Sequence, residues 1–326
     1  MSNYKVSVIV PVYKVRHFIE RCAMSLFSQT LQAVEYIFVN DATPDDSVDI
    51  LRRVISSYPQ RKVTILEHEY NKGLPAARNT GLAVASGEYV FHCDSDDYVE
   101  PDMLQVLYDK AKQCNADMVW CDWFLRFTQN ERYMKEPSYA TSYDALCGIL
   151  SGNMKYNVWN KLAKRSLYED NQISFPAGHA MGEDMTMIRL LGSAKIVAYV
   201  PCAYYHYVRT NANAYTQTVN TKMLQDLRFN VEETMWFLEK RFPDSLQKEK
   251  NYFKLNVKLP FLITSERKQY QLWEEWYPEA NEYILSNKNQ KLYTRILQWM
   301  AWHKQFWFVR LYYCIFIKFR YGVIYK

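Results

Sequence analysis

Hydrophobic and polar residues alternate in blocks over the first 122 residues, and the period of the pattern changes from block to block. Continuous apolar runs, typical of buried strands, alternate with segments whose apolar residues recur every three or four positions, typical of helices. The predicted strands are 6–12, 34–39, 63–66, 89–91 and 117–123, and the predicted helices are 16–30, 45–58, 74–86 and 102–114. This alternation predicts an α/β fold with a doubly wound, mostly parallel sheet that helices cover on both faces.

The alternation weakens after about residue 125, and from about residue 221 the pattern is helical and strongly aromatic. A chain of 326 residues is long enough for two domains. We therefore expect a catalytic or binding domain over 1–215 and a helical, aromatic and basic region over 216–326. Within the first domain, 156–168 reads as a helical, aromatic segment.

Polar residues follow the carboxyl ends of the first four predicted strands. Pro11 lies at the end of the first strand and Tyr13 follows it, Asp41 follows the second, Glu67 the third, and the acidic run 94–97 the fourth. Ligands of open α/β sheets bind beyond these ends, close to the point where the strand order reverses. We therefore expect one crevice here, in which Tyr13 stacks on a flat base or packs against its own strand. Asp41 would accept a hydrogen bond from the base or cap the next helix.

The stretch "FHCDSDD" runs a buried strand directly into Asp94, Asp96 and Asp97, with Ser95 between them. Carboxylates this close repel one another unless a cation lies among them. Asp94 and Asp96, two positions apart, can turn toward one spot, and carboxylate oxygens with diphosphate oxygens and water suit Mg²⁺ or Mn²⁺. The alternative is a solvated acidic loop that caps the following helix. We place Pro11, Asp94 and Ser95 in a nucleotide-sugar site as well.

Two further segments carry charged residues suited to chemistry. Arg78, on the inner face of a small-residue helix, suits a base carbonyl or a phosphate, or pairs with Asp41 or Asp94. Glu183 and Asp184 open an apolar helix after a glycine-bearing loop, where carboxylates act as a general base or simply complement the helix dipole.

Three residues remain as weaker candidates. Lys161 suits an acceptor or phosphate contact, Arg209 suits a diphosphate, and His206 either completes a metal shell or packs in the interior. Neither GxGxxG nor GxxxxGK[ST] occurs in the chain, so dinucleotide and P-loop modes of phosphate binding are unsupported.

Five motifs together resemble a known family: "VSVIVPVYK", "FVNDATPDDS", "KGLPAARNTGL", "FHCDSDD" and "GEDM". In order and spacing they are similar to those of the inverting glycosyltransferases of family 2, which have the GT-A fold. The resemblance covers residues 4–215 and implies a metal-bound nucleotide-sugar, commonly a UDP-sugar, as donor. The residue roles that it implies are base contacts for Tyr13, Asp41 and Arg78, ribose and metal contacts for Asp94, metal binding for Asp96, and general-base catalysis for Asp184 with Glu183 beside it. The family's common Asp-Asp pair is Asn40-Asp41 here.

The implied reaction is a single displacement with inversion, in which a hydroxyl of a glycan or lipid-linked acceptor attacks as the diphosphate leaves. Cell-surface polysaccharide synthesis is the expected setting. Two other functions stay open, a sugar nucleotidyltransferase and a non-catalytic, glycan-binding or scaffold member of the same fold. The first would require a glycine-rich phosphate loop, and the second has no use for a general base.

Charge is unevenly distributed along the chain, whose net charge is +5. No acidic residue follows Glu282, whereas eight basic residues do, so that the first 282 residues carry a net charge of −3. The segment 293–326 mixes these basic residues with Trp, Tyr and Phe, a composition typical of a helix in a membrane interface. The alternative is aromatic packing or a contact between copies of the chain. The segment is too apolar for a nucleic-acid groove.

Seven scattered cysteines without a CxxC pair indicate reduced, mostly buried thiols. The N-terminal segment does not read as a signal peptide, and no uncharged apolar run approaches the ~20 residues that span a bilayer. We therefore expect a cytoplasmic protein that lies peripherally on the inner face of the cell membrane.

Overall fold

The computed structural model describes residues 3–180, 182–209 and 221–316 and divides into two compact units. The first unit comprises Met1–Arg126, Glu131–Ser142 and Tyr156–Thr234. The second comprises Phe127–Asn130, Tyr143–Lys155 and Met235–Lys326. The first unit thus extends beyond the expected boundary at residue 215, and residues 143–155 belong to the second.

The first unit is built around one sheet. Its strands are β1 (Val6–Val12), β2 (Val34–Asn40), β3 (Lys62–Glu67), β4 (Tyr89–His92), β5 (Tyr98–Val99), β6 (Met118–Arg126), β7 (Glu131–Met134), β8 (Lys161–Lys164) and β9 (Val197–Val208). The helices of this unit are α1 (Ile19–Phe27), α2 (Ser47–Ser56), α3 (Leu74–Val84), α4 (Met103–Cys114), α6 (Arg165–Asp170), α7 (Glu183–Ser193) and the first part of α8 (Thr221–Arg241).

The strand order is β3-β2-β1-β4-β8-β6-β9-β5, with β7 added on β6. Strands β3, β2, β1 and β4 pair in parallel, as expected for a doubly wound fold. The order reverses at β1, which has β2 on one side and β4 on the other. Strand β8 then pairs antiparallel with both β4 and β6, so the second half of the sheet is mixed. The α/β fold class is confirmed.

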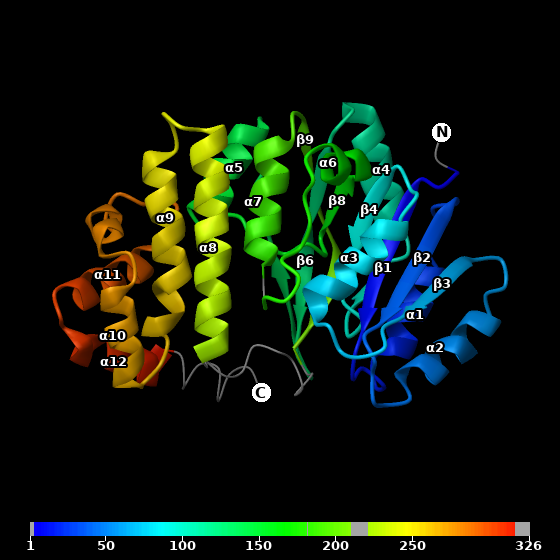
Figure 1. Ribbon diagram of the computed structural model, residues 1–326, viewed down its shortest axis with the longest axis horizontal. Coiled ribbons are helices and arrows are strands. Elements are labelled where there is room, and N and C mark those ends of the chain that lie inside the picture. Colours follow the sequence, from blue (N-terminus) through cyan, green and yellow to red (C-terminus); the bar gives the residue numbers. More distant parts are fainter. Residues whose placement is uncertain (1–2, 181, 210–220, 317–326) are drawn as a thin grey trace. The chain divides into compact units, whose positions relative to one another are not determined.

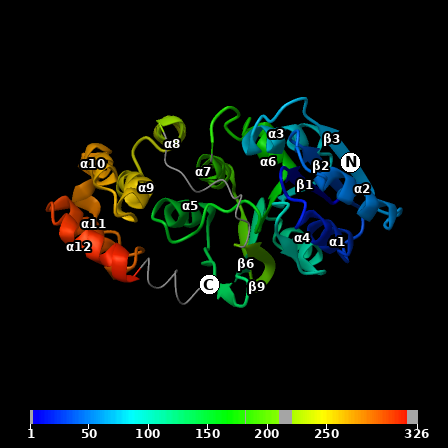
Figure 2. The same cartoon turned by 90° about the horizontal axis from the view of Figure 1, so that it is seen from below.

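Helices cover both faces of the parallel half (Figure 2), with α1 and α4 on one face and α3 on the other. Val6, Val8 and Val10 of β1 share a buried cluster with apolar residues of α1, α2 and α4. Ile9, which points to the opposite face, lies against α3 at Gly81. This alternation along a strand buried on both faces explains why β1 reads as an unbroken apolar run.

Two predictions about strands and helices were wrong in detail, whereas the first strand spans Val6–Val12 as expected. Pro11 is tolerated within it because it lies beyond the last β1–β4 pair and breaks no bond to β4. The strand expected at 117–123 is longer and ends at Arg126. The segment 156–168 is not simply helical, since β8 lies between β4 and β6 and is followed by the short helix α6.

The described part of the second unit is helical (Figure 1). Its elements are α5 (Ser142–Leu150), the end of α8, α9 (Gln247–Lys258), the 3₁₀ helices η2 (Leu259–Leu262) and η3 (Pro278–Tyr283), α10 (Arg267–Glu275), α11 (Leu292–Trp302) and α12 (Phe306–Tyr312). Lys258 is fully buried there, and its ammonium group donates to the carbonyl of Trp276 and to Asn281. Among the helices that the structure describes, none combines the length and the apolar character that a bilayer span requires.

Candidate active site

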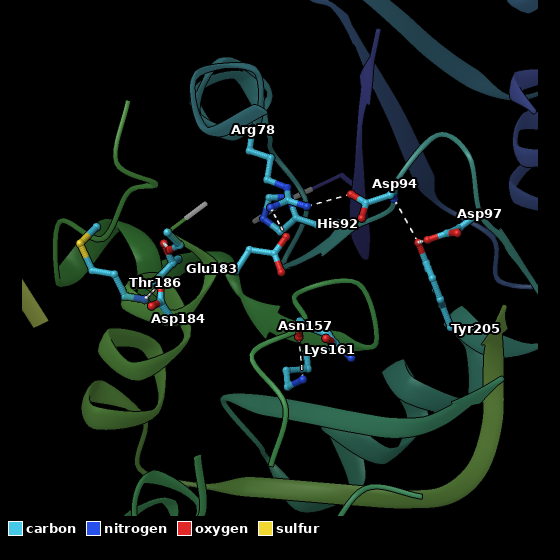
Figure 3. A network of polar contacts seen from close by, with 12 residues as sticks. Arg78, His92, Asp94, Asp97, Asn157, Lys161, Glu183, Asp184, Thr186 and Tyr205 are labelled. Carbon is cyan, nitrogen blue, oxygen red and sulfur yellow. Dashed lines mark hydrogen bonds and ion pairs between the residues drawn. The ribbon is translucent and has the colours of Figure 1, made fainter. Parts of the chain in front are cut away.

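The guanidinium group of Arg78 lies at the centre of the candidate site (Figure 3). Its Nη2 donates to Asp94 Oδ1 at 2.8 Å, and its Nη1 donates to Glu183 Oε1 at 2.6 Å. Arg78 therefore joins the turn after β4 to the first residue of α7, two segments far apart in sequence. Of the alternatives open for Arg78, pairing with Asp94 is the one observed, and the second partner, Glu183, was not anticipated.

The Arg78 side chain is almost completely buried, at 1% exposure, whereas its two carboxylate partners are 24% and 27% exposed. Burial lowers the pKa of Arg78, but Glu183 and Asp94 outweigh this effect and raise the pKa above its usual value. The guanidinium also lies 5.3 Å from the centre of the Phe175 ring. Arg78 is thus a fixed, permanently charged connection between two acidic motifs.

The acidic turn after β4 divides into buried and partly exposed residues. Ser95 and Asp97 are buried, and Asp94 and Asp96 are partly exposed. Asp97 accepts hydrogen bonds from the hydroxyl of Tyr205, at 2.7 Å, and from the backbone N–H of Val208, at 2.7 Å. Asp97 therefore ties the turn to β9 and has a structural role. Asp94 and Asp96 are the two members of the run that are partly exposed.

Tyr205 supports the same turn and was missed by the sequence analysis. Its hydroxyl accepts the backbone N–H of Asp94 at 3.1 Å while it donates to Asp97. The fully buried Tyr205 ring stacks on Trp159 with 4.4 Å between ring centres. The signal in the sequence is the alternation of tyrosines in "AYYHYV", which places Tyr205 and Tyr207 on one face of β9.

The carboxylates of this turn lie close together, and the pKa of Asp97 reflects its burial and their mutual repulsion. Burial, together with the neighbouring carboxylates of Asp96 and Asp94, raises the pKa of Asp97 well above its usual range. Within the described ranges, no group of three or more His, Cys, Asp or Glu side chains is arranged as a complete metal site. Asp94 and Asp96 supply two hard oxygen donors in a partly open position, which fits a divalent cation that takes its other ligands from substrate and water.

Helix α7 begins at Glu183, as the sequence predicted, directly after Gly182. Gly182 has a φ of 80°, and a Cβ atom at this position would lie 2.1 Å from Cγ of Pro176. Both the backbone conformation and the lack of space therefore require glycine before the two acidic residues. The turn directs Glu183 toward Arg78, whereas Asp184 points away from it (Figure 3).

The two acidic residues differ in their surroundings. Burial raises the pKa of Glu183, and the ion pair with Arg78 opposes this rise. Asp184 contacts no cation among the residues that the structure describes; its Oδ1 accepts the backbone N–H of Met185 at 2.9 Å. Burial raises the pKa of Asp184 to about 6, and that hydrogen bond opposes the rise. A carboxylate with a pKa of about 6 is ionised at neutral pH and can still hold a proton that it accepts.

Asp41 is buried, and both of its carboxylate oxygens have partners within the chain. Oδ1 contacts His68 Nδ1 at 2.7 Å and accepts the N–H of Lys72 at 2.7 Å, while Oδ2 accepts the N–H of Gly73 at 2.8 Å. Asp41 therefore shapes the loop that precedes α3. Its contact with a nucleotide base stays a prediction. Tyr13 is 39% exposed at the end of β1, as stacking on a base requires.

The structure does not bring His206 to the aspartates. Its ring is stacked between Tyr98 and Phe124, and its Nε2 lies 2.7 Å from Glu100 Oε1. Because side chains alternate along β9, His206 points to the face opposite that of Tyr205. The assignment of His206 as a metal ligand was therefore wrong, and packing was the correct alternative.

Lys161 and Arg209 have different environments. Lys161 is buried at the start of β8, and its ammonium group donates to Asn157 O at 2.6 Å and Asn160 Oδ1 at 2.7 Å. Burial lowers the pKa of Lys161 to about 8, opposed by the charges of Glu136 and Glu183. Arg209 is exposed, one residue beyond the Val208–Asp97 contact. Substrate contacts of both residues stay predictions.

Curated proteins with similar sequences include glycosyltransferases. The chain is 30% identical over 233 residues to EpsH of Bacillus subtilis, which carries the name of a glycosyltransferase. That match covers 69% of this chain and 66% of EpsH, so it spans slightly less than two thirds of the relative's length.

Two solved structures share the fold. Residues 1–349 of TarS from S. aureus, in complex with UDP-GlcNAc, match with a TM-score of 0.64 at 18% identity, over 95% of this chain and 91% of that one. The mannosyltransferase PcManGT from Pyrobaculum calidifontis, in complex with GDP-Man and Mn²⁺, matches with a TM-score of 0.54 at 16% identity, over 95% and 87%. The sequence profile of the family described as "Glycosyl transferase family 2" matches residues 7–186. The chain therefore belongs to glycosyl transferase family 2.

Proposed function

We propose that this protein is a metal-dependent inverting glycosyltransferase that moves a sugar from a nucleotide-diphospho-sugar, a UDP-sugar, to a hydroxyl group of a glycan or lipid-linked acceptor. Synthesis of a cell-surface polysaccharide is the setting that fits this reaction. Family membership supports sugar transfer, and the chemistry of the acidic residues supports the mechanism.

The observation that carries this proposal is the bridge that Arg78 makes between Asp94 and Glu183. An inverting transfer requires a group that takes the proton of the attacking hydroxyl on one side of the reacting carbon and a site for the departing diphosphate on the other. Arg78 holds the two acidic motifs that would supply these functions at a fixed spacing. Such positioning lowers the entropic cost of bringing the reacting groups together.

Asp184 acts as the general base in this proposal. With a pKa of about 6, its carboxylate is ionised at pH 7 and accepts the proton of the acceptor hydroxyl as that oxygen attacks the anomeric carbon. Proton transfer of this kind contributes a rate factor of ~10²–10⁴. Glu183 remains paired with Arg78 throughout and keeps the start of α7 in place.

Asp94 and Asp96 would hold a Mn²⁺ or Mg²⁺ ion, and such a cation stabilises negative charge on a departing diphosphate. The protein's own contribution is to present these two carboxylates on a supported turn. Arg78 neutralises part of the charge of Asp94, and Asp97 is engaged by Tyr205 and Val208.

Release of UDP from a panel of UDP-sugars tests this function, with Mn²⁺ or Mg²⁺ present and with a chelator in parallel. We expect Asp184→Asn to lower the transfer rate at least ~10²-fold at pH 7. Asp49→Asn is the matched control, because Asp49 is an exposed acidic residue in the first turn of another helix, α2. Unchanged transfer by the Asp184 variant, or full activity in chelator, would refute the corresponding part of the mechanism.

We also propose that the protein binds the cytoplasmic leaflet of the cell membrane through α11, α12 and the residues just after them. Large apolar side chains are exposed there, namely Leu292, Tyr293, Ile296, Trp302, Trp307, Leu311, Ile315 and Phe316. Lys291, Lys304 and Arg310 lie among them, and no acidic residue follows Glu282 in the sequence. Apolar side chains with basic neighbours favour a surface that is both lipidic and anionic.

Sedimentation with vesicles tests this second proposal. The variant Trp307→Ser/Leu311→Ser alters exposed positions only and should lose most of its binding to vesicles that contain phosphatidylglycerol. Binding of the wild type to phosphatidylcholine vesicles should be weaker, because the basic residues then lack a counter-charge. If the wild-type chain binds neither type of vesicle and light scattering shows that it is a dimer, this surface is instead a contact between copies of the chain.

A further inference from the structure

We propose that the first half of α8 is a working part of the active site, in which Asp226 and Asn230 are positioning residues for Asp184. This inference rests on the proposed function, since it assigns the residues that hold the general base in place. It concerns a helix that lies outside residues 7–186, the part of the chain that matches the family profile.

The two side chains hold both backbone polar groups of one residue, Ala180, in the loop before α7. Asp226 Oδ2 accepts the N–H of Ala180 at 3.0 Å, and the amide of Asn230 donates to the carbonyl of Ala180 at 3.1 Å. Asp226 is 2% exposed and Asn230 is fully buried. Ala180 precedes Asp184 by four positions, so a shift of this residue is transmitted over a very short stretch of chain.

The neighbouring residue of the loop, His179, is held by the same helix. Its Nδ1 lies 3.0 Å from Asp226 Oδ1, and its ring stacks on that of Phe229, with 3.8 Å between ring centres and 6° between planes. Lys222 also donates to Asp226, at 2.9 Å, and to the carbonyl of Gly178, at 3.1 Å. Three successive residues of the loop, 178–180, therefore contact α8.

The beginning of the loop is held from the opposite side, by α3. The side-chain amide of Asn79 donates to the carbonyl of Phe175 at 2.8 Å and its oxygen accepts the N–H of Phe175 at 2.8 Å. Asn79 follows Arg78 directly in sequence. The helix that fixes Glu183 through Arg78 therefore also fixes the start of the loop, and α8 fixes its middle.

A second contact joins α7 itself to α8. Arg189, on the second turn of α7, donates to Glu233 at 2.8 Å. Because α8 holds both the loop before Asp184 and the helix after it, the position of the base depends on this helix. Burying a carboxylate and an amide is costly unless their polar atoms find partners. Both oxygens of Asp226 and the amide nitrogen of Asn230 have partners, whereas Asn230 Oδ1 has none within the described part of the chain.

The test compares Asp226→Ala, Asp226→Asn and Asn230→Ala in the full-length chain. We expect Asp226→Ala to lower kcat ~10–100-fold while KM for the UDP-sugar changes less than about twofold, because misplacing a catalytic group affects the reacting complex and not donor binding. Asp226→Asn should recover most of the rate, since its amide oxygen can still accept the N–H of Ala180. Glu232→Gln, which alters an exposed acidic residue near the middle of the same helix, is the matched control.

Hydrogen exchange of the peptides that cover 176–184 provides a readout that does not depend on turnover. Asp226→Ala and Asn230→Ala should both exchange faster there, with protection of β1 and β2 unchanged. Faster exchange with wild-type kcat in both variants would overturn the positioning role and leave the proposed function intact. A wild-type chain that turns over no nucleotide-sugar would instead refute the function itself. If Asp226→Ala does not fold, Asn230→Ala decides, because it removes one neutral hydrogen bond only.

Discussion

Replacing Arg78 by Met offers the sharpest test of the bridge between the two acidic motifs. The substitution keeps most of the volume of the side chain but removes the charge that Asp94 and Glu183 share. Both carboxylates would then face each other without a cation, at 24% and 27% exposure. Most of the loss of stability should therefore come from the two carboxylates, which stay partly buried without a counter-charge. The loss of the hydrogen bonds from Arg78 should contribute less.

The magnitude follows from this picture. Breaking a buried ion pair by removing one partner costs about 3–5 kcal/mol, and the partial exposure of the carboxylates favours the lower end, about 3 kcal/mol. Removing one of the two carboxylates as well should restore part of the loss. We expect the double variant Arg78→Met/Glu183→Gln to be more stable than Arg78→Met by about 1 kcal/mol. Added to a cost of about 1.5–3 kcal/mol for Glu183→Gln in the wild type, this gives a coupling energy of at least about 2.5 kcal/mol, at the upper end of the usual range for residues in contact.

Urea unfolding of the wild type, both single variants and the double variant provides the measurement. Glu183→Gln alone should cost about 1.5–3 kcal/mol, because it weakens a hydrogen bond to a charged donor. The sign of the Glu183→Gln effect should therefore reverse between the two backgrounds, destabilising with Arg78 present and stabilising with Met at that position.

Two results would refute this reasoning. If the free energy of unfolding of Arg78→Met lies within about 1 kcal/mol of the wild-type value, the bridge between Asp94 and Glu183 contributes little to the stability of the fold. If Glu183→Gln destabilises both backgrounds equally, the two residues are not coupled, and the bridge does not hold α7 against the turn after β4.

Three other predictions concern the same site. The ratio kcat/KM should fall about tenfold per pH unit below pH ~6 and level off above it, because Asp184, with its pKa raised to about 6, must be ionised to take up a proton; a profile that is flat from pH 5 to 7 would contradict this role. Tyr205→Phe should cost about 2–3 kcal/mol in urea unfolding, because one hydroxyl serves both Asp97 and the N–H of Asp94, and a loss below about 0.5 kcal/mol would show that water replaces it. Gly182→Ala should lower kcat at least ~10-fold, because the loop must move away from Pro176, and wild-type kinetics would show that the turn adapts without moving Asp184.

The parallel half of the sheet could be predicted from the sequence because its signals are local. Each strand from β1 to β4 is an apolar run bounded by turn residues, and the expected β1 range matches the observed one residue for residue. The acidic residues of the site could be placed for the same reason, since they follow strand ends directly. The start of α7 at Glu183 was marked by the glycine before it.

The second half of the sheet depends on contacts between distant residues. Strand β8 has only four residues and exists because it pairs with 89–91 and with 118–120, segments that lie far from it in sequence. No local pattern distinguishes such a strand from the helix that follows it. The side chain of Lys161 was therefore assigned to the wrong kind of element, although its burial follows directly from the position of β8 between two other strands.

The error at His206 has a similar physical origin. Whether Tyr205 or His206 faces the aspartates depends on the register of β9 against β5 and β6, and a shift of one residue exchanges the two faces. Asp97 shows the converse, because its structural role appears only when Tyr205 and Val208 arrive from more than a hundred residues away. Residue type was sufficient to find the acidic cluster, but not to divide its members by role.

The close approach of α3 to β1 has a consequence for how this protein can change over evolutionary time. A methyl group at Gly81 would come within 2.4 Å of Cγ2 of Ile9, so the helix could accept it only by rising from the sheet. Arg78 lies one helical turn away from Gly81, and such a rise would withdraw its guanidinium from both acidic partners. Substitution at 81 therefore calls for a smaller residue at 9 in the same lineage, and the two positions should vary together.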